Sequence, residues 1–406
     1  MKAIIPLLFL NVLFSACQST SHDSTGSIDQ QWEKAFFGDD NDMPKRAVVL
    51  PEKKEIIILG QKFFGPEGMR SSCALLKIDF EGNQLKRQLF GTSDDRLTFI
   101  DHYKDGNLLL LGDKGEYMNR SLWMKVINSN FDIIKDTAIA DMHVQDLYGP
   151  KFQKTKDGNI VVVYNSDKGV RVVKMNDKFE MLWTKDYKNE FMEVGEVGMT
   201  FHDFIIDSKE NLVLVGSGQP FQKGGNPEYN YDFFLMKLNE KGDSLWRSII
   251  GKGDRYYTGY SVTECGGNYF ATGMSRDNDK GVEDSFDSDV YSFSPQGKLN
   301  WHTELKGSDT EYGIQVLPYD STSILATGWT SSHDGHFVSD EKVTKSYVAR
   351  LDLKGQIKSM QTFNQEGSDE VAFITPISGK QYLILSSGSS NNGGSNMWKV
   401  YWKKIE

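Results

Sequence analysis

The stretch DNDKG at residues 277–281 places carboxylate and amide oxygens at alternate positions, as loops that bind Ca²⁺ do. It departs from the full twelve-residue calcium loop, because Ser288 stands where the closing glutamate belongs. Asp277 and Asp279 are therefore candidate ligands for Ca²⁺, the one cofactor that the sequence suggests. The alternative is a polar turn in which Asp and Asn side chains bond to their own backbone.

No motif of a common catalytic class occurs in the sequence. There is no Gly-x-Ser-x-Gly elbow, no His-Glu-x-x-His pair, no P-loop and no Gly-x-Gly-x-x-Gly turn. The seven histidines do not cluster at the spacing of metal ligands. Two carboxylates from separate parts of the chain could still converge to cleave a glycoside. The sequence thus predicts no catalytic residue and leaves catalysis open.

Two of the three cysteines lie far apart in the chain, at Cys73 and Cys265. A disulfide requires Cα atoms within about 7 Å. Because these residues fall at different places in different repeats, we expect free, buried thiols and no cysteine metal site.

The charge balance excludes one class of partner. The chain has a net charge of -10 and a pI near 5.3, and no basic stripe interrupts it. Proteins that bind nucleic acid neutralise phosphates with clustered Lys and Arg. We therefore expect no nucleic-acid partner.

The N-terminus resembles a lipoprotein signal. Lys2 precedes an apolar run of about 12 residues, which is too short to span a bilayer and suits a signal peptide. The run ends in LFSAC at residues 13–17, which resembles a bacterial lipobox and predicts lipidation of Cys17. A plain secretory signal is the alternative. We expect a signal peptide at 1–16, a flexible polar tether at 17–31 and a cell-envelope protein anchored to the outer membrane, with the leaflet left open.

Seven copies of a four-run unit fill the rest of the chain, at a period of about 50 to 60 residues. In one copy the runs are WRSII (246–250), GYSVTE (259–264), NYFATG (268–273) and VYSFSP (290–295). Such short runs are rich in Val, Ile, Leu and aromatic residues and are bounded by Gly, Asp and Asn. Four strands per repeat predict an all-β fold, a seven-bladed β-propeller over residues 32–406.

The order of the runs also predicts how the ring closes. The Trp-containing run is interpreted as the outermost strand of the preceding blade, so the first copy at Trp32 has no blade before it. It can pair with the last run at 397–402 and close the ring without an open edge. The recurring Trp is expected to fill the gap between blades. Three copies, beginning at Lys86, Lys135 and Met360, lack it and must pack differently.

The repeats resemble those of β-propeller lipoproteins and secreted proteins of the Bacteroidetes. The resemblance rests on W-x-K-x-x-G-x-S-D, D-G-N-hydrophobic-G and L-x-K-x-D-x-x-G, and it covers residues 32–406. It implies the propeller architecture. That family has no single activity or catalytic residue that could be carried over.

Loop lengths distinguish the two faces of the ring. The connection from first to second strand and the Gly turn before the outermost strand are short, and they share what we call the trimmed face. The blade-to-blade crossings and the connections from second to third strand share the opposite, long-loop face. Four of the latter are long, at 60–72, 216–232, 273–289 and 328–346. Long loops on a rigid scaffold carry most binding sites.

Candidate ligand-binding residues are aromatic and polar side chains on the long-loop face, each of which could instead be a packing or solvated residue. Those near the central channel are Arg46, Arg96, Tyr148, His202, Tyr257 and Tyr312. Those on the long loops are Tyr229, Tyr231 and Trp329.

Three functions remain open. The first is a membrane-tethered, non-catalytic propeller that binds an envelope protein or a glycan through the long-loop face. The second is a carbohydrate-active enzyme with its site at the channel mouth. The third is a structural subunit of an envelope complex. A pair of buried carboxylates with shifted pKa values would favour the enzyme, and a shallow aromatic groove would favour glycan binding.

Overall fold

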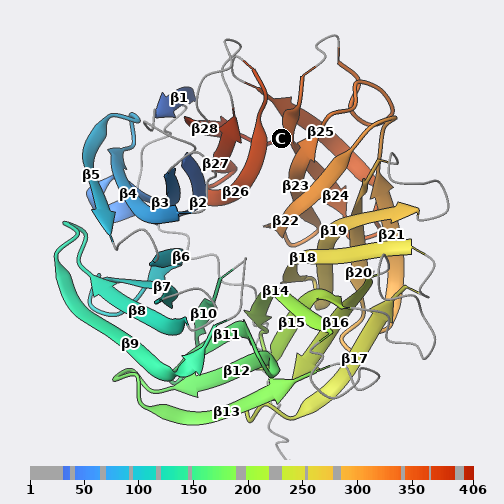
Figure 1. Ribbon diagram of the computed structural model, residues 1–406. Coiled ribbons are helices and arrows are strands. Elements are labelled where there is room, and N and C mark those ends of the chain that lie inside the picture. Colours follow the sequence, from blue (N-terminus) through green and yellow to red (C-terminus); the bar gives the residue numbers. More distant parts are fainter. Residues whose placement is uncertain are drawn as a thin grey trace, which may run out of the picture.

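The computed structural model describes residues 31–36, 42–64, 70–90, 95–115, 120–144, 149–188, 198–218, 231–251, 255–277, 285–339, 343–364, 367–388 and 397–406. Their strands form seven four-stranded antiparallel sheets arranged in a ring (Figure 1). The predicted seven-bladed propeller is therefore confirmed. Among these residues, no helix is long and apolar enough to cross a membrane.

Each blade contributes one strand to each of four concentric positions. The innermost strands are β2 (Asp42–Leu50), β6 (Arg96–His102), β10 (Lys151–Lys154), β14 (Met199–Ile206), β18 (Arg255–Cys265), β22 (Glu311–Asp320) and β26 (Glu370–Ser378). The second strands are β3 (Glu55–Phe64), β7 (Leu108–Lys114), β11 (Ile160–Ser166), β15 (Leu212–Gly218), β19 (Asn268–Asp277), β23 (Ser323–Thr330) and β27 (Gln381–Gly388).

The third strands are β4 (Arg70–Asp79), β8 (Ser121–Ile127), β12 (Gly169–Met175), β16 (Asp232–Leu238), β20 (Asp287–Phe293), β24 (Lys345–Asp352) and β28 (Met397–Lys404). The outermost are β5 (Gln84–Phe90), β9 (Ile133–His143), β13 (Met181–Tyr187), β17 (Ser244–Ile250), β21 (Leu299–Leu305), β25 (Ile357–Phe363) and β1 (Trp32–Phe36). One 3₁₀ turn, η1 (Pro51–Lys53), joins β2 to β3. Blades 1 to 7 are numbered from β2–β5 to β26–β28 with β1.

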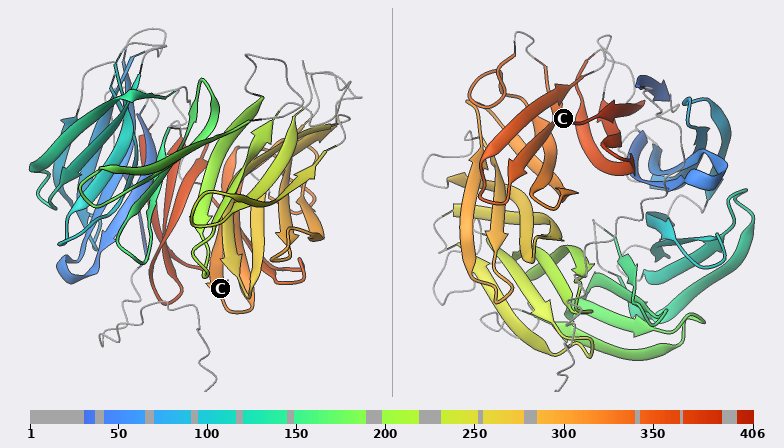
Figure 2. Two further views of the ribbon diagram at one scale, coloured as in Figure 1. Left: turned by 90° about the horizontal axis from the view of Figure 1, so that it is seen from below. Right: turned by 180° about the vertical axis from the view of Figure 1, so that it is seen from behind.

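The ring closes as predicted, through the N-terminal strand. β1 pairs antiparallel with β28, from Trp32 opposite Trp402 to Phe36 opposite Trp398. In the side view of Figure 2 the C-terminus lies at the trimmed face, where β28 ends. The closing pair leaves blade 7 with four strands, as in the other blades.

The core lies between adjacent blades. The second strands are buried on both faces, which explains why runs such as Ile160–Ser166 are almost continuously apolar. Phe99 of blade 2 meets Phe152 of blade 3 edge to face, with ring centroids 5.4 Å apart. As predicted, Cys73 and Cys265 are both buried and form no disulfide with each other.

Four outermost strands carry the predicted Trp, and it joins the next blade. The indole N–H groups of Trp32, Trp246 and Trp301 donate hydrogen bonds of 2.7, 3.0 and 2.9 Å to backbone carbonyls in the following blade's last turn. That turn holds a glycine with positive φ. A Cβ added to Gly297 would lie 2.6 Å from Trp246, and one added to Gly355 would lie 2.8 Å from Trp301. Trp and Gly thus recur together because they pack on each other.

Two of the three copies without Trp use a second solution, a lysine on a phenylalanine. Lys86 and Lys135 occupy the Trp position, and Phe131 and Phe179 replace the glycine while keeping its positive φ, at 69° and 71°. The Lys135 ammonium lies 4.0 Å from the Phe179 ring centroid, and the Lys86 ammonium 5.3 Å from that of Phe131. Each lysine also donates a hydrogen bond to a carbonyl of that turn. These blades do pack differently, as expected.

Candidate functional site

Six of the seven innermost strands carry a β-bulge at the same place, near their N-terminal ends, which lie at the long-loop face. A bulge adds one residue that has no partner on the neighbouring strand, and it turns the side chains nearby. Among the described residues, β10 pairs without one. The extra residues are all of different types: Lys45, Thr98, His202, Tyr260, Ile314 and Ala372.

The bulges surround a cavity of about 300 Å³ at the centre of the ring. Five of the six bulge residues line it, and every innermost strand contributes at least one side chain. The second strands add residues near their ends at the long-loop face. The remaining polar and aromatic lining residues are Arg46, Gln61, Phe99, Lys151, Tyr312, Trp329, Glu370, Phe373 and Ser387.

Two cationic lining residues are fixed by neighbouring blades. Arg46 donates to the Ile100 carbonyl at 2.9 Å and pairs with Asp101 at 2.9 Å. Lys151 pairs with Asp203 at 3.0 Å. Because these bonds cross from one blade to the next, they hold the positive groups in place at the cavity wall.

Lys45 is a third cation in the cavity, and its situation differs. Burial and the nearby positive charge of Arg96 lower the pKa of Lys45 below its ordinary 10.5. Among the described residues, no carboxylate lies within ion-pair distance of its ammonium. A partly buried ammonium without a counter-ion is costly, and a bound anion would relieve that cost.

His202 and Tyr260 form the side of the cavity contributed by blades 4 and 5. His202 is 4% exposed, and burial together with the charge of Lys151 lowers its pKa to about 3. Its Nε2 lies 3.3 Å from Ser217 Oγ, and its ring meets Tyr260 edge to face at 4.9 Å. At neutral pH the imidazole is therefore uncharged and serves as a hydrogen-bonding group.

Blades 6 and 7 contribute an aromatic surface and a carboxylate. The rings of Tyr312 and Trp329 stack at 4.5 Å with an interplanar angle of 11°. Both are partly exposed in the cavity. Burial raises the pKa of Glu370, the one carboxylate among the described lining residues. The cavity thus offers a flat aromatic face, hydrogen-bonding groups, one acid and three cations, of which Arg46 and Lys151 are paired with aspartates.

The structure brings four of the sequence candidates to the cavity, namely Arg46, His202, Tyr312 and Trp329. Arg96 instead forms a two-point ion pair with the buried carboxylate of Asp113, at 3.0 and 2.9 Å.

The other candidates lie elsewhere or outside the described residues. Tyr257 packs between blades 4 and 5, against their apolar cluster. Tyr231 is partly buried, with its ring 5.1 Å from that of Tyr256. Tyr148, Tyr229, Asp279 and Cys17 lie outside the described residues. Asp277 is the last residue of β19, and the structure describes its backbone only.

Several cavity residues were not among the sequence candidates, namely Lys45, Gln61, Lys151 and Tyr260. The available signal is the alignment of the seven innermost strands on one another. In that alignment the bulge residue differs in type in each of the six blades. The residue two places after it is apolar in all six, namely Ala47, Ile100, Phe204, Val262, Val316 and Ile374.

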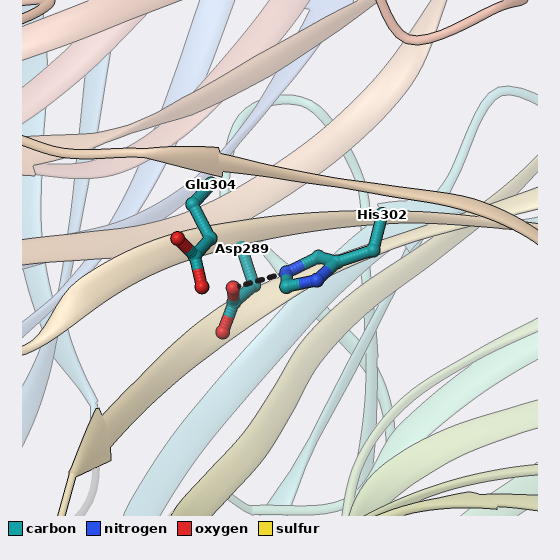
Figure 3. Close-up of side chains that lie close together, drawn as sticks. All are labelled: Asp289, His302 and Glu304. Atoms are coloured by element: carbon teal, nitrogen blue, oxygen red, sulfur yellow. Dashed lines mark hydrogen bonds and ion pairs between the residues drawn. The ribbon is translucent and has the colours of Figure 1, made fainter.

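A second cluster, on blade 5, has the composition of a metal site. One ligand atom each from Asp289, His302 and Glu304 lies within 4.8 Å of the others (Figure 3). His302 Nε2 is already 2.6 Å from Asp289. Glu304 is 2.8 Å from Lys306 and 3.6 Å from Arg255. Burial opposes ionisation of Glu304, but the Lys306 hydrogen bond prevails and lowers its pKa. The negative charge is thus balanced by cations of the chain.

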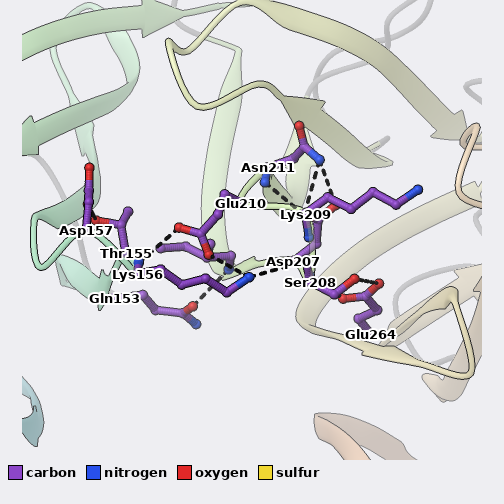
Figure 4. A network of polar contacts seen from close by, with 11 residues as sticks. Gln153, Thr155, Lys156, Asp157, Asp207, Ser208, Lys209, Glu210, Asn211 and Glu264 are labelled. Carbon is purple, nitrogen blue, oxygen red and sulfur yellow. Dashed lines mark hydrogen bonds and ion pairs between the residues drawn. The ribbon is translucent and has the colours of Figure 1, made fainter. Parts of the chain in front are cut away.

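Polar groups on the trimmed face connect neighbouring blades (Figure 4). The Lys156 backbone N–H donates to Glu210 at 3.0 Å, and its ammonium donates to the Ser208 carbonyl at 3.0 Å. Ser208 in turn donates to Glu264 through its backbone and hydroxyl. These contacts join blades 3, 4 and 5, so polar side chains here have a structural role.

No family model matches this chain, and no curated protein matches it either. Solved structures match it over most of its length. The polysaccharide lyase Uly1 has a TM-score of 0.53 at 12% identity, covering 94% of each chain. An ulvan lyase bound to -[GlcA(1-4)Rha3S]- has a TM-score of 0.55 at 11% identity, covering 90% of this chain and 95% of that one. Sqt1 from Chaetomium thermophilum has a TM-score of 0.51 at 10% identity, covering 91% and 97%. At these identities the likeness shows the propeller fold alone.

Proposed function

We propose that this protein binds a carbohydrate chain in the channel cavity, as a non-catalytic propeller tethered to the outer membrane of a bacterial envelope through Cys17. The observation that carries the proposal is the stacked pair Tyr312–Trp329 in a cavity lined with hydrogen-bonding groups. A sugar ring presents apolar C–H groups on its faces and hydroxyls on its edge. A flat aromatic face with polar groups around it complements both.

The chemistry of the lining favours binding over cleavage. Glycosidases pair two carboxylates about 5 to 10 Å apart, whereas Glu370 is the one carboxylate among the described lining residues. A general base works best when its pKa lies near the working pH. The pKa of His202 is about 3, so its imidazole is a poor base at neutral pH.

Similar structures support each of the two partner classes. Two are polysaccharide lyases, one of them with a bound glycan. Another, Sqt1, is bound to the N-terminus of a ribosomal protein. A peptide partner is therefore the second candidate. The glycan is preferred because the stacked pair faces the cavity.

The proposed lipid anchor on Cys17 would keep the binding site close to the membrane surface. Acyl chains on Cys17 hold a protein at a membrane surface, since each buried CH₂ contributes about 0.8 kcal/mol. Residues 17–31 supply a polar tether between the lipid and the ring. Radiolabelled palmitate incorporation into wild type but not Cys17→Ala tests this part of the proposal.

Binding is tested with full-length protein in detergent on a glycan array, followed by calorimetry. We expect wild type to bind at least one class of glycan and Trp329→Ala to bind that glycan more weakly, by about fivefold or more. The matched control is Tyr319→Ala, which removes a partly buried aromatic ring from β22 at its trimmed-face end. Equal loss in both variants, or no glycan bound by wild type, would contradict the proposal. Product analysis of each bound glycan by mass spectrometry decides between binding and cleavage.

A further inference from the structure

An unbroken row of five aromatic rings begins in the cavity and crosses the long-loop face. Trp329 stacks on Tyr312, whose ring lies 5.3 Å from that of Phe286. Phe286 is 5.8 Å from Tyr256, and Tyr256 is 5.1 Å from Tyr231. All five residues are partly exposed. We call this set the aromatic row; it extends from blade 6 across blade 5 to the edge of blade 4.

An arginine lies on the middle of the aromatic row. The Arg276 guanidinium carbon is 4.9 Å from the Phe286 ring centroid and 5.8 Å from that of Tyr256. Among the described residues, its buried Nε has no hydrogen-bond partner and its guanidinium has no carboxylate partner. An arginine held against aromatic rings keeps its N–H groups available for two-point binding of an anion.

The cavity end of the aromatic row has a comparable cation. Lys45 lies in the cavity wall, and none of the described carboxylates pairs with it. The chain has 56 acidic and 46 basic residues, so acidic partners for cations are in excess. Two cations that have no such partner among the described residues, at the start and the middle of one path, indicate that the occupant of the path is itself negatively charged.

We infer that the carbohydrate of the proposed function is an acidic polysaccharide, which extends from the cavity along the aromatic row. One acid group of the chain binds at Lys45 and another at Arg276, while the sugar rings between them stack on aromatic side chains. The inference rests on the proposed function and narrows its ligand. Uronate carboxylates and sulfate esters share the required chemistry. Single-stranded nucleic acid also combines stacking with charge, so oligo-thymidylate is one of the comparisons in the experiment.

The experiment is calorimetric titration of full-length protein in detergent with defined oligomers. The probes are oligogalacturonate and sulfated carrageenan oligosaccharides, each as dimer and hexamer, with neutral maltohexaose and oligo-thymidylate as comparisons. We expect an acidic hexamer to bind about tenfold or more tightly than maltohexaose, since a hydrogen bond to a charged group contributes roughly ten- to hundredfold. The acidic series that binds more tightly identifies the acid group.

Two variants locate the acid groups along the path. Lys45→Gln should weaken binding of the acidic dimer and hexamer alike. Arg276→Gln should weaken the hexamer about tenfold and leave the dimer unchanged, because only the longer chain reaches blade 5. The control is Arg350→Gln, since Arg350 lies 5.1 Å from the Tyr319 ring in a similar arginine–aromatic pair at the trimmed face.

The outcomes separate this inference from the function on which it rests. Neutral and acidic hexamers bound equally well by wild type would overturn the inference and leave carbohydrate binding intact. So would an Arg276→Gln variant that binds the hexamer as wild type does while retaining the wild-type melting temperature. Oligo-thymidylate bound as tightly as the acidic hexamer would also overturn it. Failure of every glycan would overturn the proposed function itself.

Discussion

The blade joints and the channel cavity use the seven repeats in opposite ways. At six of the seven joints the same pair of positions recurs, filled by Trp on Gly or by Lys on Phe. In five of them the Trp or Lys donates a hydrogen bond to the same turn of the next blade. Around the cavity the backbone recurs, as a bulge at the same place in six blades, but the inserted residue changes from Lys to Thr, His, Tyr, Ile and Ala.

The difference teaches where specificity resides in a repeat protein. A position whose neighbour is another repeat must match that neighbour, so only a few residue pairs fit it. A bulge position faces the central channel on one side. Even where it touches the next repeat, as His202 touches Tyr260, it has fewer neighbours to match and can take a residue that suits a ligand. We therefore expect substitutions at the joints to change stability and substitutions at the bulges to change binding.

The largest effect is expected at a joint. Trp246→Ala should lower the free energy of unfolding by about 3 kcal/mol, because it removes a large ring packed in the blade 4–5 cluster and the hydrogen bond to Pro295. Urea unfolding followed by circular dichroism measures this loss. The affinity of the folded protein for its glycan should not change. If Trp246→Ala lost binding without losing stability, the expectation that joint residues govern stability and bulge residues govern binding would be wrong.

The two kinds of joint also predict a compensating exchange. Gly297→Phe alone should destabilise the fold, because any Cβ there lies 2.6 Å from the Trp246 ring. Adding Trp246→Lys creates the Lys–Phe pair of the other joints and should restore about 1 to 2 kcal/mol. A double-mutant cycle on unfolding free energies measures this coupling. Additive losses would show that the pairs are not interchangeable.

Within the cavity, Trp329→Ala should weaken glycan binding by about 1 kcal/mol or more, since it removes one side of the stacked pair. Its effect on unfolding should be smaller than that of Trp246→Ala, because Trp329 faces the cavity. Calorimetry and urea unfolding on the same preparation measure both. An unfolding loss as large as that of Trp246→Ala would make Trp329 a packing residue.

The smallest effect is a dependence of acidic-glycan binding on pH. The pKa of Lys45 is lowered, so its ammonium loses its proton, and its attraction for an acid group, at a lower pH than an ordinary lysine. Binding should weaken as the pH rises through that value. The pKa of Glu370 is raised, so Glu370 takes up a proton, and stops repelling an acid group, at a higher pH than an ordinary glutamate. Binding should therefore strengthen as the pH falls. Arg46 and Lys151 also line the cavity. Titrations across pH on wild type and Lys45→Gln test this, and an unchanged alkaline limb in the variant would contradict it.

The fold could be predicted because its signals are local. Apolar runs such as Leu212–Gly218 and turn residues such as Gly242 recur in each copy, and the Trp marks the outermost strand. The closing strand at Trp32 followed from counting runs. The partner of each Trp was not evident, because it lies in the next blade's turn, about 50 residues further along the chain.

The site could be predicted only in part, and the bulges explain why. Side chains alternate between the faces of a regular strand, and one inserted residue shifts that alternation. Lys45 and Tyr260 reach the cavity because they are the inserted residues. Arg96 and Tyr257, chosen for their closeness to the strand starts, lie in an ion pair and a blade interface instead. Inserted residues of different types leave no shared motif in the sequence.

The most direct measurement is a crystal structure of the protein with an acidic hexasaccharide. The expected result is sugar density in the channel cavity, stacked on Tyr312 and Trp329, with an acid group at Lys45 and the chain continuing toward Arg276. Density confined to the trimmed face or to the outer rim, with an empty cavity, would contradict the assignment of the bulge ring as the binding site.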